Sequence, residues 1–371
     1  MADAFEFADE LGPYKIVHVY EPSMDLRATA VVDNVAAGPA IGGLRIAVDV
    51  STRECFRLAR AMTLKNAAAG LAHGGGKSVM RADPSMPLAD KEARLRCFAS
   101  ALRQLDEYII GPDMGTNEQC MSWVHDEIGR AVGLPRELGG IPLDELGATG
   151  WGVFHATDVA ARRLGLSLKG ARFVIQGFGS VGMHAARFLA DHGAILVAAC
   201  DSRGSVTDAD GLEVAALTEL KKAGKSVVDA GIGVVSDDPD AVIDVPCDIW
   251  IPAARPDVID ESNVGRLKTK IVAQGANIPL TDSAEIILHE RGVLCLPDFI
   301  ANAGGVICAA VEYAGGGERA AFSAIEEKIR LNTEAMLDIS ENRRISPRAA
   351  AMKLAVERVN TAMSSRRWRV F

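Results

Sequence analysis

Short apolar runs alternate with helical stretches through the second half of the chain, from Trp151 onward. This alternation is typical of an α/β domain in which helices cover both faces of a parallel sheet. The runs expected to form strands cover residues 173–175, 195–200, 248–253, 270–276 and 292–296. Two helical stretches, at about residues 317–339 and 346–363, close the chain, and the last is expected to pack back on the first half.

The first half of the chain shows a different pattern. Three alternating or apolar runs between residues 14 and 50 are separated by Pro22 and by a glycine-containing turn at 38–43, which predicts a β-meander. Ser51 and Glu54 have the spacing of a capping box, so a helix is expected to begin at about residue 52. The positions that recur at helical spacing, and so predict the core-facing stripe of that helix, are Leu58, Met62, Lys65 and Ala69.

The length of the chain predicts two domains, because 371 residues exceed the size at which one hydrophobic core keeps growing. A glycine-rich stretch at residues 139–150 marks the boundary. The predicted first domain covers residues 1–148 and is joined by a C-terminal helix at about 340–371. The predicted second domain covers residues 149–339, and the fold class is α/β.

One strand, turn, helix and strand unit carries the sequence pattern of a dinucleotide site. An apolar run leads into a G-x-G-x-x-G turn, a helix follows, and the next apolar run ends on Asp201. The turn consists of Gly177, Phe178, Gly179, Ser180, Val181 and Gly182. Such glycines let the backbone approach a pyrophosphate at a helix N-terminus, and the acidic residue accepts hydrogen bonds from the ribose. The alternative is a tight turn in an ordinary α/β unit.

Two lysines lie where water is expected to be scarce. Lys65 belongs to the predicted core-facing stripe and needs an anion there, unless its stem lies along the surface and its ammonium reaches water. Lys77 follows Gly74, Gly75 and Gly76, whose lack of side chains allows close packing around one amine and limits its solvation. A phosphate loop of the NTPase type is excluded because Leu71 occupies the position of its first glycine.

Three polar residues follow predicted strands at the ends where ligands bind. Asp113 comes after the apolar run 108–110, and Asn277 and Asn302 lie in the loops beyond two strands of the second domain. In open α/β sheets the carboxyl ends of the strands face the ligand, so these side chains are candidates for substrate or cofactor contacts. Aspartate and asparagine are also common turn residues, and this alternative stays open at all three positions.

Composition narrows the classes of function. A net charge of −9 disfavours a nucleic-acid partner, and no apolar run reaches membrane-spanning length. The N-terminus is acidic and has no signal-peptide core, and the seven cysteines form no C-x-x-C pair. These features predict a cytoplasmic protein with reduced cysteines. No histidine pair has zinc-ligand spacing, so no metal site is expected.

Seven ordered blocks together resemble the glutamate/leucine/phenylalanine/valine dehydrogenase family. They are Pro39–Arg45 (PAIGGLR), Met62–Lys65 (MTLK), Gly74–Ser78 (GGGKS), Gly111–Asp113 (GPD), Ala148–Gly150 (ATG), Gln176–Gly182 (QGFGSVG) and Asn302–Gly305 (NAGG). The resemblance implies an N-terminal substrate domain, a Rossmann-type cofactor domain, an active site in the cleft between them and a homo-oligomer. It also implies oxidative deamination of an amino acid to the 2-oxo acid and ammonia, and the reverse reaction.

The resemblance assigns roles to individual residues. Lys65 would bind the substrate α-carboxylate, Lys77 would be the general acid or base, and Asp113 would orient Lys77. Asn277 would hold the substrate, Asn302 the cofactor and Thr149 the carboxamide of the nicotinamide. Asp201 favours NAD by repelling the 2′-phosphate of NADP, although Arg203 next to it leaves NADP possible.

Substrate choice depends on a few positions near the first block. Glutamate-specific members of the family carry a lysine where this chain has Ile41, next to Gly42, and a serine where it has Ala309. Together with Val306 these residues predict an apolar pocket and a substrate of the phenylalanine, leucine or valine class, because a γ-carboxylate would find neither a cation nor a hydrogen bond. Two alternatives stay open: a glutamate dehydrogenase, and a catalytically silent dinucleotide sensor with the same fold.

Overall fold

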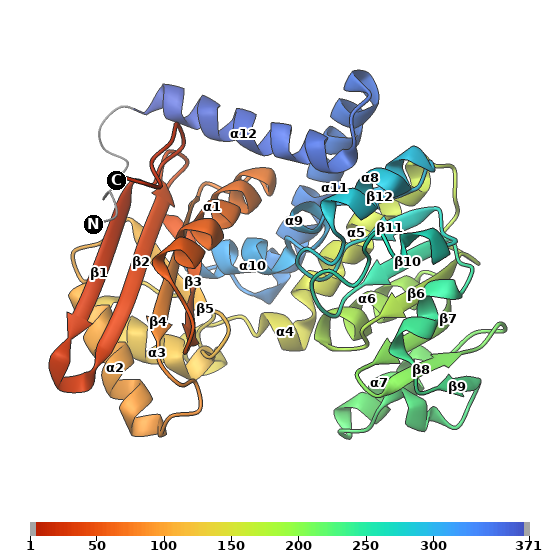
Figure 1. Cartoon of the computed structure of the whole chain (residues 1–371), viewed down its shortest axis with the longest axis horizontal. Helices are drawn as coiled ribbons and strands as arrows, with labels where there is room; N and C mark the ends of the chain where they lie inside the picture. Colours follow the sequence, from red (N-terminus) through yellow and green to blue (C-terminus); the bar gives the residue numbers. More distant parts are fainter. Residues whose placement is uncertain (1–4, 367–371) are drawn as a thin grey trace. The chain divides into compact units, whose positions relative to one another are not determined.

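The computed structural model describes residues 5–366, which divide into two compact units (Figure 1). The first unit takes in the chain up to Pro142, the segment Val306–Ala321 and the chain from Met352. The second unit comprises Leu143–Gly305 and Phe322–Ala351. These units differ from the predicted domains because the segment after Gly305 returns to the first unit, and because the final helix joins that unit only from Met352. The last part of the predicted C-terminal helix, residues 367–371, lies outside the described residues.

The sheet of the first unit has the order β1-β2-β4-β3-β5. Its strands are β1 (Lys15–Glu21), β2 (Leu26–Asn34), β3 (Ala40–Ala47), β4 (Gly74–Arg81) and β5 (Tyr108–Pro112). The predicted meander is therefore wrong, because β4 lies between β2 and β3. Helix α1 (Thr52–Ala68) connects β3 to the parallel strand β4, and Ser51 caps it as predicted by accepting a hydrogen bond from Glu54 N.

The two faces of this sheet are covered by different helices (Figure 1). Helices α2 (Leu88–Ala101) and α3 (Glu118–Ile128) pack on the face that carries Ala40, Leu44 and Ile46. Helix α1 packs on the opposite face, where Cys55 and Ala59 contact strand side chains. Because successive strand residues point to opposite faces, Ile41, Gly43 and Arg45 of β3 share the α1 face.

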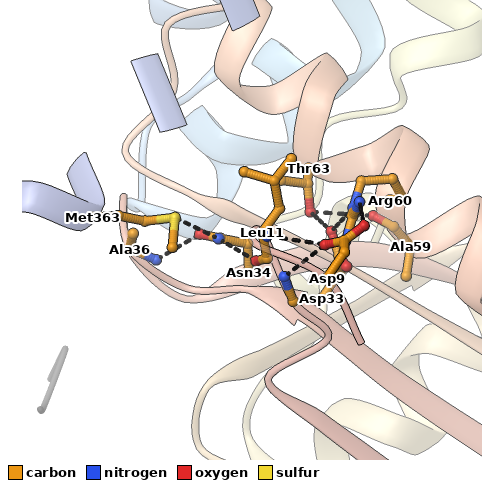
Figure 2. Close-up of polar contacts among 10 residues, drawn as sticks. Asp9, Leu11, Asp33, Asn34, Ala36, Ala59, Arg60, Thr63 and Met363 are labelled. Carbon is orange, nitrogen blue, oxygen red and sulfur yellow. Dashed lines mark hydrogen bonds and ion pairs between the residues drawn. The ribbon is translucent and has the colours of Figure 1, made fainter. Parts of the chain in front are cut away.

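Buried polar contacts hold α1 on its strands (Figure 2). Asp33, which is fully buried on β2, accepts hydrogen bonds from Thr63 Oγ1 at 2.6 Å and from Arg60 Nε at 2.8 Å. The other nitrogens of Arg60 donate to both carboxylate oxygens of Asp9, at 2.7 and 2.8 Å. The N-terminal segment, β2 and α1 are therefore joined through one guanidinium.

The same contacts show that the predicted stripe of α1 was misplaced. Of the predicted stripe, Ala69 is buried, whereas Leu58, Met62 and Lys65 are half-buried. The buried side chains within α1 are Cys55, Ala59, Thr63, Asn66, Ala67 and Ala68. Threonine and asparagine are buried because their polar groups have partners, such as the carbonyl of Gly74 at 2.7 Å from Asn66 Nδ2. A pattern that counts only apolar positions overlooks such a stripe.

The second unit is built on a sheet of order β12-β11-β10-β6-β7-β8-β9. Its strands are β6 (Arg172–Gln176), β7 (Ile195–Asp201), β8 (Gly204–Thr207), β9 (Val234–Ser236), β10 (Ile249–Pro252), β11 (Ile271–Ala273) and β12 (Leu294–Leu296). The five strands β6, β7 and β10–β12 are parallel within the described residues, as predicted. The antiparallel strands β8 and β9 were not predicted and make the sheet mixed.

Helices lie on both faces of this second sheet, which confirms the α/β fold class with a Rossmann-like second domain. The helices of the unit are α4 (Leu143–Leu146), α5 (Ala148–Arg163), α6 (Ser180–Asp191), α7 (Val214–Lys222), α8 (Asp282–Glu290), α9 (Asp298–Ala301) and most of α11 (Glu318–Arg343). Helices α10 (Gly304–Tyr313) and α12 (Pro347–Ser365) are each divided between the units. Among the helices within residues 5–366, none combines the length and apolar composition needed to cross a bilayer.

Candidate functional site

Lys77 and Asp113 form an ion pair in the first unit. Lys77 lies on β4 and is 6% exposed, and its Nζ is 2.6 Å from Asp113 Oδ2, just beyond the end of β5. Both side chains lie on the α1 face of the sheet, next to Gly43 of β3. An added Cβ at Gly43 would stand 2.8 Å from Asp113 Cβ and 3.2 Å from Lys77 Nζ. The pairing of Lys77 with Asp113, predicted only by resemblance, is thus present in the folded unit.

Asp113 is shared between two cations. Arg45 Nε lies 3.1 Å from the same Oδ2 atom, and Arg45 is itself paired with Glu54 at 2.7 Å. Burial by itself raises the pKa of Asp113, but the charge and hydrogen bond of Lys77 and the charge of Arg45 outweigh it and bring the pKa below its ordinary value. Asp113 therefore stays ionised and divides its charge between a lysine and an arginine.

Thr116 fixes the turn that carries Asp113. Its Oγ1 accepts a hydrogen bond from Asp113 N at 2.9 Å and donates to carbonyl oxygens of Leu44 and Asp113. The next residue in the chain, Asn117, caps α3 by accepting a hydrogen bond from Cys120 N. Asp113 is therefore both a turn residue and a candidate functional residue, because its backbone forms the turn and its side chain contacts Lys77.

An apolar group lies on the same face of the sheet, toward the start of β3. Ile41, Ile109, Val132 and Ala309 are buried together. Ile41 is two residues before Gly43 and so points to the side on which Lys77 stands. Of the predicted pocket residues, the structure brings Ile41 and Ala309 together, whereas Val306 is half-buried outside this group.

Gly42 and Lys65, the other predicted substrate residues, are also in the first unit. Gly42 packs directly on β4, where an added Cβ would overlap with the carbonyl oxygen of Gly76. Lys65 is half-buried near the end of α1, two residues after Thr63, which contacts the backbone at Gly75. Its role as the carboxylate-binding group stays a prediction.

The glycine turn of the second unit has the geometry that a dinucleotide needs. Gly177 adopts φ +99° and Gly182 packs against the Gly177 carbonyl, whereas an added Cβ at Gly179 would meet nothing within 4 Å. Gly179 is also the N-cap of α6 and supplies no side-chain cap, so the first amides of this helix are free to bind an anion. The buried Phe178 anchors the turn by donating from its N–H to the Cys200 carbonyl at 2.7 Å.

A cavity of about 480 Å³ adjoins this turn at the carboxyl ends of β6, β7 and β10. Its walls include Gly177, Phe178, Gly179, Asp201, Ser202, Lys221 and Arg255. Ser180 and Val181 continue from the turn into α6, where Ser180 Oγ donates to the Asp144 carbonyl at 3.1 Å. The open glycine, the uncapped helix and the adjacent carboxylate together fit a pyrophosphate and a ribose.

Asp201 is held by several donors. Lys221 Nζ and Ser226 Oγ each lie 2.7 Å from one of its oxygens, and the Val227 and Arg203 amides add two more hydrogen bonds. Burial raises the pKa of Asp201, but these donors outweigh it and lower the pKa to about 2. The Arg203 guanidinium, considered a 2′-phosphate ligand, pairs instead with Asp229 at 3.0 Å, and Lys221 is the cation next to Asp201.

We expect Asp201 to make stability depend on pH in the acid range. Its pKa lies below the ordinary value of 3.8, so its contribution to folding is present above about pH 4 and is lost as the pH falls toward 2. An Asp201→Asn variant should unfold at lower urea than the parent at pH 5, and the gap should narrow toward pH 2. Urea midpoints measured at unit pH intervals test this, and a gap independent of pH would contradict it.

The two asparagines lie in adjoining loops of the second unit. Asn302 Nδ2 is 3.0 Å from Asn277 Oδ1 and also donates to the carbonyls of Gly275 and Ala276. Asn277 is exposed and Asn302 is 4% exposed. Gly304 and Gly305, just after Asn302, pack on the start of α5, where an added Cβ at Gly305 would stand 3.3 Å from Thr149 Oγ1. Asn277 and Asn302 are therefore in contact, and Gly305, three residues after Asn302, lies beside Thr149.

Reasoning from the sequence missed three side chains that complete these sites. Arg45 stands in a quoted block but received no role, and its spacing from Asp113 in the chain gave no signal of contact. Lys221 lies on α7 and Arg348 on α12, among other polar residues that do not distinguish them in the sequence. All three side chains meet their partners because the packing of strands and helices brings distant parts of the chain together.

Two family profiles match almost the whole chain. The profile described as Glu/Leu/Phe/Val dehydrogenase, dimerisation domain, matches residues 16–130. The profile described as Glutamate/Leucine/Phenylalanine/Valine dehydrogenase matches residues 139–367. The chain belongs to this dehydrogenase family. The family resemblance drawn from the seven sequence blocks is thereby confirmed.

Named relatives of this dehydrogenase are similar over most of its length. A glutamate dehydrogenase of Aeropyrum pernix is 38% identical, with 90% of this chain and 85% of the relative covered. An NADP-specific glutamate dehydrogenase of Saccharolobus shibatae (36%; 90% and 83% covered) and an NAD-specific one of Staphylococcus aureus (35%; 90% and 85% covered) are similar as well. The chain is accordingly an amino acid dehydrogenase, an oxidoreductase that acts on a CH–NH₂ group with NAD or NADP.

Solved structures of the family share the fold. A hetero-hexameric glutamate dehydrogenase from Thermus thermophilus, in a Leu-bound form, aligns with a TM-score of 0.83 at 28% identity and covers 96% of this chain and 91% of its own. An L-tryptophan dehydrogenase from Nostoc punctiforme aligns with a TM-score of 0.76 at 25% identity, covering 95% and 97%. The fold of this dehydrogenase is therefore found with both an acidic and an aromatic substrate.

Proposed function

We propose that this dehydrogenase oxidises an L-amino acid with an apolar side chain, of the phenylalanine, leucine or valine class, and reduces NAD. The observation that carries the choice is the apolar group Ile41, Ile109, Val132 and Ala309 on the face of the sheet that carries Lys77. A carboxylate placed against this group would lose its hydration without gaining a partner. An apolar side chain gains free energy from the same burial.

Glutamate is the second candidate, and the comparisons favour it. The relatives of 35–38% identity described above are all named glutamate dehydrogenases. Overall identity reflects the whole fold, whereas substrate choice depends on the few side chains that contact the reactant. For this reason we give the apolar group of this chain more weight than the names. The catalytically silent sensor is not supported, because these relatives are named as enzymes.

The residues of the first unit suit proton transfer at the amino group. We assign the α-carboxylate to Lys65, and proton transfer between the substrate nitrogen, water and the reaction centre to Lys77 Nζ. Asp113 orients that amine at 2.6 Å. Arg45 Nε lies 3.1 Å from the same Asp113 oxygen, so the carboxylate is held between the arginine and the lysine. An amine fixed in this way can exchange protons with the substrate nitrogen and with water.

The second unit would hold the cofactor. We assign the pyrophosphate to Gly177–Gly182 and the N-terminus of α6, the adenosine ribose to Asp201, and the nicotinamide end to Thr149 and Asn302. A nicotinamide held there would accept the hydride that leaves Cα. Water then adds to the resulting iminium, and ammonia leaves to give the 2-oxo acid. NAD is the proposed cofactor because Asp201 disfavours a 2′-phosphate, although Lys221 beside it reduces that repulsion.

We propose that copies of this chain form a homo-oligomer through the first unit. Strand β1 is at the edge of its sheet, and Tyr20 at its end is 64% exposed. An exposed edge strand presents unpaired backbone groups to another chain. The matching dimerisation profile and the hexameric Thermus relative support this proposal. The remaining partners are the amino acid, the 2-oxo acid and ammonia, with no role proposed for nucleic acid or membrane.

A panel of amino acids tests the proposed substrate. With NAD or NADP and absorbance at the reduced nicotinamide band as the readout, we expect kcat/KM for the best apolar amino acid to exceed that for glutamate about 100-fold or more. Replacing Ile41 with Lys should lower the ratio of kcat/KM for the apolar amino acid to kcat/KM for glutamate by at least about tenfold. The new ammonium would pair with the γ-carboxylate of glutamate and would place a charge within the apolar group. Glutamate as the best substrate of the unaltered enzyme would refute the apolar proposal and establish the second candidate.

A further inference from the structure

Arg348, in the first turn of α12, joins three polar side chains of the second unit. Its Nε and Nη2 each lie 2.7 Å from one carboxylate oxygen of Glu285 on α8. The same Nη2 donates to Gln274 Oε1 at 3.1 Å and to Asp298 Oδ1 at 3.0 Å. One planar guanidinium therefore reaches the ends of two strands, β11 and β12, and the helix between them.

Two of these partners begin the loops that carry the candidate asparagines. Gln274 opens the loop that leads to Asn277, and Asp298 opens the helix that leads to Asn302. The second oxygen of Asp298 accepts a hydrogen bond from the N–H of Ile278 at 3.0 Å. Ile278 follows Asn277 directly, so Asp298 links the guanidinium to the Asn277 loop.

The Asn277 loop has a conformation that needs such support. Ile278 adopts φ +43°, in the left-handed region that β-branched residues rarely enter, and its side chain is 53% exposed. Packing of the Ile278 side chain therefore does little to hold this backbone. The Asp298 carboxylate on Ile278 N and the Asn302 amide on the carbonyls of Gly275 and Ala276 hold it instead.

Arg348 is hard to replace because it neutralises two buried carboxylates. The side chains of Glu285 and Asp298 are 6% and 9% exposed, and that of Arg348 is 21% exposed. Burial alone lowers the pKa of Arg348, but the hydrogen bond and charge of Glu285 and the charge of Asp298 keep it above its ordinary value. Without the guanidinium, two buried carboxylates would face each other, and Asp298 would be free to turn away from Ile278.

We propose that Arg348 is a positioning residue for the dehydrogenase reaction, which holds Asn277 and Asn302 in the geometry in which they contact the substrate and the nicotinamide. This inference rests on the proposed roles of the two asparagines. It adds a residue outside the seven blocks, on the C-terminal helix. Arg348 touches neither reactant and acts through Gln274 and Asp298.

Steady-state kinetics of Arg348→Met and Arg348→Lys test the proposal. We expect Arg348→Met to lower kcat at least about tenfold, because small displacements of positioning groups cost one to two orders of magnitude. Arg348→Lys keeps a charge but loses the fork that reaches Glu285 and Asp298 together, so it should lose at least about threefold. The dissociation constant of NADH should change by a smaller factor than kcat in both variants, since the glycine turn and Asp201, which hold the rest of the cofactor, are not touched.

Arg330→Met is the matched control. Arg330 lies in the same unit, its side chain is 25% exposed, and it pairs at 2.7 Å with Asp158, whose side chain is 10% exposed. Removing it breaks a similar ion pair away from the asparagine loops. We expect a comparable fall in thermal midpoint for Arg330→Met and Arg348→Met, with kcat of the control within about twofold of the parent.

A double-mutant cycle with Asn302→Ala separates positioning from general stability. If Arg348 acts through the asparagine loops, Arg348→Met combined with Asn302→Ala should be no more than about twofold worse than Asn302→Ala alone. If the two losses of kcat multiply in the double variant, the proposal is overturned. Full turnover in either Arg348 variant would overturn it as well. If Arg348→Met does not fold, Arg348→Lys takes its place in the cycle under the same criteria. An inactive parent enzyme would instead refute the proposed function.

Discussion

Replacing Lys77 with Met is expected to lower kcat about 10³-fold while leaving NADH binding unchanged. The ammonium of Lys77 is buried at 2.6 Å from Asp113, and Met fills similar space without a proton to exchange. Positioned general acids and bases contribute about 10² to 10⁴ in rate. The measurement is turnover with the best amino acid of the panel, together with titration of NADH fluorescence.

Lys15→Met is the control for the loss of a lysine–carboxylate pair. Lys15 on β1 pairs with Glu107, which is 6% exposed, in the same unit as Lys77. We expect this variant to keep kcat within about twofold of the parent. If Lys77→Met retained a tenth of the turnover, or if Lys15→Met lost as much as Lys77→Met, Lys77 would not be the group that transfers the proton.

Replacing Gly42 with Ala is expected to destabilise the first unit by about 3 kcal/mol or more. An added Cβ would overlap with the Gly76 carbonyl oxygen and lie 2.5 Å from its carbonyl carbon, so two paired strands would have to separate. Overpacking against side chains costs about 1–3 kcal/mol, and backbone atoms between hydrogen-bonded strands relax less than side chains. Because β4 carries Lys77, turnover should fall together with the urea midpoint.

Gly317→Ala provides the comparison for that experiment. Gly317 belongs to the same unit, and an added Cβ there would meet nothing within 4 Å. Its alanine variant should unfold within about 0.5 kcal/mol of the parent, as surface substitutions usually do. Equal midpoints for the two alanine variants would show that β3 and β4 separate freely, against the close packing described above.

Local sequence patterns predicted the second unit well because the residues that form each of its motifs are close together in the sequence. The turn Gly177–Gly182 follows a strand and begins a helix, and two of its glycines have local reasons: Gly177 adopts φ +99° and Gly182 packs against the Gly177 carbonyl. The antiparallel strands β8 and β9 were missed because each is short. Strand β9 has no buried face that would impose an alternation on its sequence.

The first unit was harder to predict because its burial depends on close packing of backbones. The meander was wrong because nothing between residues 14 and 50 shows that β4 will enter between β2 and β3. The stripe of α1 was misplaced because Thr63 and Asn66 are buried through hydrogen bonds to Asp33 and to the Gly74 carbonyl. Patterns of hydrophobicity do not record polar groups that find partners.

The family, the α/β class, the dinucleotide turn and the charged residues that the chemistry needs could all be predicted before the fold was known. They depend on residue type and on the spacing of a few positions along the chain. Three contacts could be seen only in the folded chain: Arg45 shares Asp113 with Lys77, Lys221 rather than Arg203 meets Asp201, and Arg348 supports both asparagine loops. The partners in each case are 20 to 74 residues apart in sequence, and packing of strands and helices brings them within hydrogen-bond distance.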